Sequence, residues 1–69
     1  MDIDKALRLL REVQQLEKEA VERYTDHISK IENPEINSML EGFKRSEERH
    51  YAELTEKIEE LKEKYDIED

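Results

Sequence analysis

The sequence predicts an all-α fold, an antiparallel hairpin of two long helices that dimerises into a four-helix bundle. Three observations predict it. Charged residues make up 46% of the 69 residues and hydrophobic ones 35%, with one Gly and one Pro, which is typical of long solvent-exposed helices. Apolar residues recur at spacings of three and four in both halves of the chain. The one strong helix breaker, Asn33-Pro34, lies near the middle.

The first helix is expected over about residues 3–31. Either Asp2 or Asp4 can cap its start, since a carboxylate there accepts hydrogen bonds from free backbone N–H groups. One face carries the apolar positions, which are Ile3, Leu7, Leu10, Val13, Ala20, Val21, Tyr24, Ile28 and Ile31.

A turn at 32–34 leads into a second helix over about residues 35–65. Asn33 is a good N-cap and Pro34 is tolerated in a first helical turn. The apolar positions of this helix are Ile36, Met39, Leu40, Phe43, Tyr51, Leu54, Ile58, Leu61 and Tyr65. Residues 66–69 are interpreted as a frayed acidic tail.

The outer faces of both helices are expected to be solvated and to carry ion pairs between residues four apart. Six such pairs place an acid before a base: Asp4/Arg8, Glu19/Arg23, Asp26/Lys30, Glu41/Arg45, Glu53/Lys57 and Glu60/Lys64.

Residues 1–69 form a single domain that is expected to associate. A hairpin cannot cover two apolar stripes by itself, because each helix shields only one side of the other. A symmetric homodimer is the natural outcome, with further association through remaining apolar positions such as Leu9 and Leu16.

The net charge of −8 favours cations as ligands and disfavours nucleic acid and anionic membranes. The chain contains no cysteine, so metal ligands must be carboxylate, imidazole or water. No apolar run approaches the length of a membrane span, and the charged N-terminus lacks the hydrophobic region of a secretory signal. These features favour a cytoplasmic location.

Three polar residues interrupt the apolar stripes, and they are the candidate site. Glu47 and His50 are spaced E-x-x-H, which places both on one helical face, and Glu17 interrupts the other helix. Because Glu17 lies 16 residues before Asn33 and the other two lie 14 and 17 after it, all three are expected at one height. A two-fold axis crossing the hairpin there would assemble four Glu and two His, the ligand set of ferritin-like di-iron proteins. Such ligands suit Fe(II), and Zn(II) or Mn(II) can substitute.

Two sequence segments resemble the ferritin-like superfamily. LEKEAVERY (16–24) is similar to the rubrerythrin-type first helix and SEERHYAEL (46–54) to its ligand-bearing partner helix. Since the chain has only two helices, it resembles most the encapsulated ferritin family of half-ferritins. The resemblance implies a ferroxidase whose catalytic metal ligands are Glu17, Glu47 and His50, with Tyr24 just outside the ligands and Glu19 where metal enters. It also implies dimers joined in a ring such as a decamer, held inside an encapsulin nanocompartment that stores the iron.

Two other functions remain open from the sequence. One is a structural oligomerisation module without metal, in which the three polar residues set the register between helices. The other is a rubrerythrin-like peroxidase, although the usual rubredoxin relay needs cysteines that this chain lacks. Gly42 is unusual within a helix, and we expect its missing side chain to admit the Tyr24 ring or a close helix.

Overall fold

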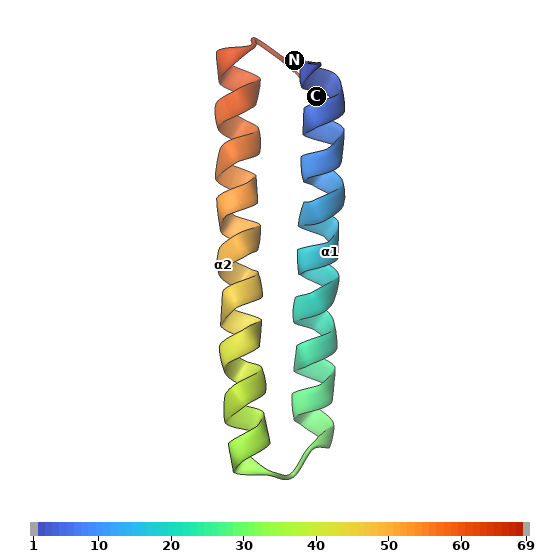
Figure 1. The fold of residues 1–69 in the computed structure, drawn as a ribbon, viewed down its shortest axis with the longest axis vertical. Coiled ribbons are helices and arrows are strands. Elements are labelled where there is room, and N and C mark those ends of the chain that lie inside the picture. The colour runs from blue at the N-terminus through green and yellow to red at the C-terminus, as the bar shows by residue number, and fades with distance from the viewer. Residues whose placement is uncertain (1, 69) are drawn as a thin grey trace.

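Two antiparallel helices of nearly equal length form the protein (Figure 1). The computed structural model describes residues 2–68 and measures 49 × 18 × 14 Å. Helix α1 spans Ile3–Lys30 and helix α2 spans Pro34–Lys64. The all-α hairpin predicted from the sequence is confirmed, while its dimerisation stays a prediction.

Both helices begin with a side-chain cap, as predicted. Asp2 caps α1, its carboxylate accepting a hydrogen bond from the backbone N–H of Lys5 at 3.1 Å. Asn33 caps α2, its Oδ1 accepting from the N–H of Ile36 at 3.0 Å. Each cap satisfies an N–H group that has no partner within the helix.

The turn has the predicted length of three residues but lies one residue earlier than expected. Helix α1 ends one residue earlier than predicted and α2 begins one earlier, leaving Ile31–Asn33 between them. The side chain of Asn37 donates a hydrogen bond to the carbonyl of Ile31 at 2.7 Å, which ties the first turn of α2 to the end of α1. This connection fixes the relative height of the two helices, on which the candidate site depends.

The predicted frayed tail is wrong for its first residues. After α2 the chain adopts a left-handed conformation at Asp66, whose φ is 52°. The N–H of Ile67 then donates to the carbonyl of Lys62 at 2.9 Å, and that of Asp66 to Glu63 at 3.3 Å. This is a Schellman cap, which the sequence concealed because the left-handed residue is Asp instead of Gly. Asp69 lies outside the described residues.

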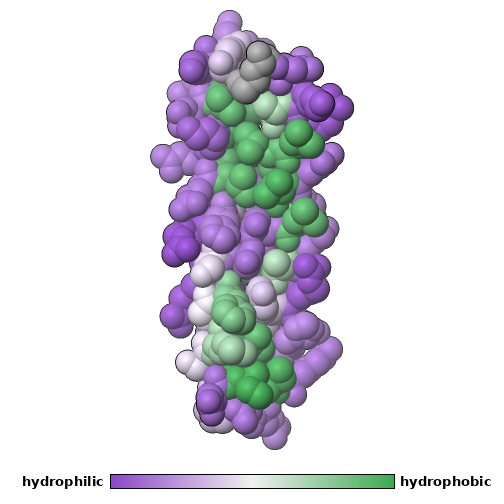
Figure 2. Space-filling view, viewed as in Figure 1, coloured by the Kyte–Doolittle hydropathy of each residue, from purple (hydrophilic) through white to green (hydrophobic). Residues whose placement is uncertain are grey.

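The hairpin buries little of its own apolar surface. Only Leu7 and Ile58 are fully buried among the described residues. Of the eight large apolar side chains that are exposed, six follow one stripe on each helix, and we call these six the apolar face: Leu9, Val13, Leu16, Ile36, Met39 and Phe43. Figure 2 shows two apolar areas along one side of the hairpin, separated midway by a hydrophilic band.

Of the six predicted ion pairs, only Asp26–Lys30 forms, with Nζ 2.9 Å from Oδ2. Lys57 contacts Glu60 at 3.2 Å instead of Glu53, which lies 3.9 Å from Arg49. All of these groups are exposed, where such pairs contribute little to stability and long side chains readily exchange partners. Within residues 2–68, neither helix has the length of apolar sequence that crossing a membrane requires.

Candidate metal centre

The three predicted ligand residues lie together in the middle of the hairpin. One ligand atom from each of Glu17, Glu47 and His50 can be chosen so that all three lie within 4.8 Å of one another. The Nδ1 atom of His50 is 3.6 Å from Oε2 of Glu17 and 4.0 Å from Oε2 of Glu47. In residues 2–68 no other three His, Asp or Glu side chains converge in this way.

Local helix geometry and the short turn together produce this arrangement. Glu47 and His50 are one turn apart on α2 and therefore share a face. Glu17 comes from α1, 14 residues after its first residue Ile3 and 13 before its last residue Lys30. The group therefore sits at mid-length of the hairpin.

The two carboxylate side chains of the group are mostly buried. The side chains of Glu17 and Glu47 are 19% and 24% exposed, and that of His50 is 45% exposed. Oε2 of Glu17 is fully buried and has no hydrogen-bond partner. A buried carboxylate oxygen that accepts no hydrogen bond is costly, and Nδ1 of His50, at 3.6 Å, is too far away to donate one. A cation bound beside His50 would supply the missing interaction.

A hollow of about 300 Å³ opens onto this group from solvent. Glu17 and His50 line it together with two apolar residues, Val13 and Leu54. Its remaining lining residues, Glu53 and Lys57, were not among the predicted site residues. The spacing E-x-x-H-x-x-E over 47–53 is the sequence signal that could have indicated Glu53, since residues at i, i+3 and i+6 step around neighbouring parts of one face.

Two residues expected near the centre take different positions. The Tyr24 ring packs against Phe43, with centroids 6.1 Å apart and planes tilted by 56°. Glu19 accepts a hydrogen bond from Gln15 at 3.2 Å and does not line the hollow. Because two residues correspond to about 200° of rotation around a helix, Glu19 and Glu17 project from opposite sides of α1. The supporting role of Tyr24 and the metal-uptake role of Glu19 stay predictions.

The hypothesis that the Tyr24 ring fills the space beside Gly42 is wrong. A Cβ atom built on Gly42 would meet nothing within 4 Å. The ring contacts the neighbouring residue Phe43 instead. A close helix from another molecule remains the prediction for Gly42.

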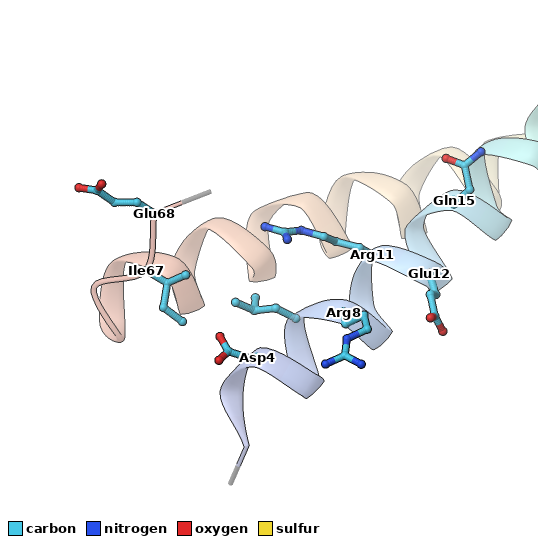
Figure 3. A pocket seen from close by; sticks show the side chains of 8 residues that line it. Asp4, Arg8, Arg11, Glu12, Gln15, Ile67 and Glu68 are labelled. Atoms are coloured by element: carbon cyan, nitrogen blue, oxygen red, sulfur yellow. The ribbon is translucent and has the colours of Figure 1, made fainter.

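A larger hollow, of about 550 Å³, lies at the open end of the hairpin but does not resemble a metal site. Figure 3 shows its acidic side chains Asp4, Glu12 and Glu68 pointing in different directions, with Arg8 and Arg11 among them. Carboxylates that diverge and are interleaved with arginines cannot share one cation. The volume of a hollow therefore does not by itself identify the candidate site.

No protein-family model, curated protein or solved structure matches this chain. The resemblance to encapsulated ferritins stays a prediction from the two short segments, and the fold adds only that the three candidate ligand residues lie near one another.

Proposed function

We propose that this protein is a ferroxidase in which two copies of the hairpin share a centre that binds and oxidises two Fe(II) ions. The buried, unpartnered Oε2 of Glu17, 3.6 Å from the His50 ring, is the observation that carries the proposal. Two carboxylates and one imidazole are a donor set suited to Fe(II). Here Fe(II) is the substrate and leaves the centre as Fe(III).

A second copy is needed to complete the coordination. One hairpin offers three ligand residues, fewer than two iron ions require. Since the group sits at mid-length of the hairpin, a two-fold axis crossing the hairpin at that height would bring two groups together. The exposed apolar residues on both sides of the group would be covered by the same contact. Four Glu and two His would then surround the iron.

The residues of the centre have distinct parts in the reaction. Glu17 and Glu47 supply negative charge that stabilises the ferric product more than the ferrous substrate. His50 supplies a neutral nitrogen ligand, held in place by its position between the two carboxylates. Two Fe(II) ions held side by side deliver two electrons, the number that reduces O2 to peroxide or peroxide to water. The reaction thus needs both hairpins at once.

Storage of the product requires a container that the hairpin does not provide. A molecule 49 Å long and 14 Å thick encloses no volume for a mineral. We propose that a larger ring of dimers, such as a decamer, releases Fe(III) inside an encapsulin-type shell, and that this compartment is the protein's location. Co-purification with a shell protein from the native host would test this part separately.

The decisive experiment combines native mass, iron count and oxidation rate. Anaerobic titration with Fe(II) should give one ion per chain and an even number of subunits. Glu47→Ala and His50→Ala should each reduce the oxidation rate by about 100-fold or more, because ligand loss removes the bound substrate. Glu48→Ala, one residue away and exposed, is the matched control and should retain the rate. Equal rates in all four proteins would reject the assignment.

The extent of the apolar face favours one alternative, a structural module that oligomerises without metal. In that case the three polar residues would only set the register of the helices. Replacing Glu17, Glu47 and His50 together by Leu separates the two functions. If the protein is a structural module, this variant should form a more stable assembly whose stability does not change with metal. If it is a ferroxidase, the variant should lose metal-dependent assembly.

A further inference from the structure

We propose that Glu53 captures the divalent cation at the mouth of the hollow, before the ion reaches Glu17 and His50, and that Lys57 opposes this capture. The inference rests on the proposed function, because it concerns delivery of the cation to that centre. It assigns a role to a residue outside the group of Glu17, Glu47 and His50. Glu53 is therefore a positioning residue in this proposal.

The hollow has a gradient of exposure that leads toward the ligands. Glu53 lies on its outer side with a side chain that is 66% exposed. His50 is 45% exposed and Glu17 is 19% exposed. An exposed carboxylate can take up an ion that still carries its water, while a buried one must replace that water. Successive carboxylates along such a gradient divide the dehydration of the cation into smaller steps.

The partners of Glu53 and Lys57 leave the acid more available than the base. Oε1 of Glu53 is 3.9 Å from Nε of Arg49, too long for a hydrogen bond. The Nζ atom of Lys57 is held by both carboxylate oxygens of Glu60, each at 3.2 Å. The Glu60 carboxylate therefore weakens the positive field of Lys57 at the hollow without removing it. Glu53 is held less tightly than Lys57, because its ion pair with Arg49 is longer.

The walls of the hollow strengthen the effect of this charge. Val13 and Leu54 line it between the polar residues. Apolar walls lower the local dielectric and concentrate the field of a carboxylate along the hollow. A cation near Glu53 is therefore drawn inward, toward the unpartnered oxygen of Glu17. Lys57 acts in the opposite sense because its positive charge repels the ion at the same mouth.

Stopped-flow binding of Co(II) to the full-length protein tests the proposal without turnover, because the visible absorbance of Co(II) reports its ligands. We expect Glu53→Gln to slow Co(II) association on the order of three- to tenfold at low ionic strength, a modest electrostatic steering effect. Lys57→Gln should speed it by a similar factor. Both variants should keep the wild-type stoichiometry and final spectrum, and the rate differences should shrink at high salt.

The control is Glu56→Gln, which removes the same charge from an exposed position of α2 outside the hollow. If Glu53→Gln and Glu56→Gln slow association equally, the capture role is overturned while the proposed function stands. A lost equivalent or an altered spectrum in Glu53→Gln would make Glu53 a ligand and also overturn this role. If the wild-type protein takes up no Co(II), the proposed function fails first and this inference with it.

Discussion

Replacing Glu17 by Leu should stabilise the metal-free protein and abolish its stabilisation by metal. The side chain of Glu17 is mostly buried in the apolar stripe of α1, and its Oε2 atom has no hydrogen-bond partner. Leucine has a similar volume and carries no polar atom. The substitution therefore removes the cost of an unsatisfied carboxylate without opening a large cavity.

The expected gain in the free energy of unfolding is the cost of burying a carboxylate oxygen without a hydrogen bond, about 1–3 kcal/mol. For a domain of this size, 1 kcal/mol corresponds to a shift in Tm of about 4–8 °C. Metal should stabilise only the wild-type protein and so offset the advantage of the Leu variant. At a free metal concentration 100 times Kd, the wild-type protein should gain about 2.7 kcal/mol, and the Leu variant should gain nothing.

Thermal unfolding followed by circular dichroism at 222 nm, with and without Co(II), measures both effects. Glu56→Leu, at an exposed position on α2, controls for the loss of a negative charge and the gain of an apolar side chain. A Glu17→Leu protein that is less stable than wild type without metal, yet equally stabilised by Co(II), would refute the reasoning. Glu17 would then be a structural residue whose carboxylate is satisfied in the assembly.

Three further predictions concern the framework. Asp66→Gly should raise the Tm by a few degrees, because the φ of 52° is left-handed and glycine adopts it without the cost that a side chain incurs. Gly42→Ala should stabilise the helix by about 0.5–1 kcal/mol at low protein concentration, since the added Cβ meets nothing within 4 Å. A smaller gain at high concentration, seen by repeating the melt, would locate a helix of a second copy there. The hydrogen bond from Lys30 lowers the pKa of Asp26, so this pair contributes stability above the unfolded-state pKa and loses it as the pH falls through the lowered value. Asp26→Asn should accordingly destabilise the protein slightly near neutral pH, and the difference should vanish once the pH is well below the lowered pKa of Asp26, as measured by urea unfolding.

The sequence predicted the helices because their signals are local. Asn33-Pro34 and the apolar period identified both helices to within one residue at each boundary. The Schellman cap at Asp66 was missed because its usual signal is glycine. The ion pairs were mostly missed because exposed side chains choose among several partners of nearly equal energy. Local sequence signals therefore predicted the helix boundaries better than the ion pairs on the surface.

The candidate site was predictable in its centre and less so at its edge. Similar distances from Asn33 along the chain were enough to place Glu17 beside Glu47 and His50, since the two helices are antiparallel and the turn is short. Glu53 was not predicted because the spacing E-x-x-H-x-x-E shows only that it shares a face with His50, whereas its position at the hollow depends on packing between the helices. The Tyr24 ring packs on Phe43, one residue from the expected Gly42. Residue spacing predicted the height of the ring along the hairpin but not the side chain that it contacts.

Both ends of the chain emerge at the same end of the hairpin, opposite the turn (Figure 1). In the proposed pair, a crossing two-fold axis places the end of one copy next to the turn of the other. Fusing two copies into one polypeptide would then require a linker that travels the full 49 Å length of the molecule, roughly 14 extended residues. A gene duplication with a short linker would instead force a different pairing and separate the two halves of the centre.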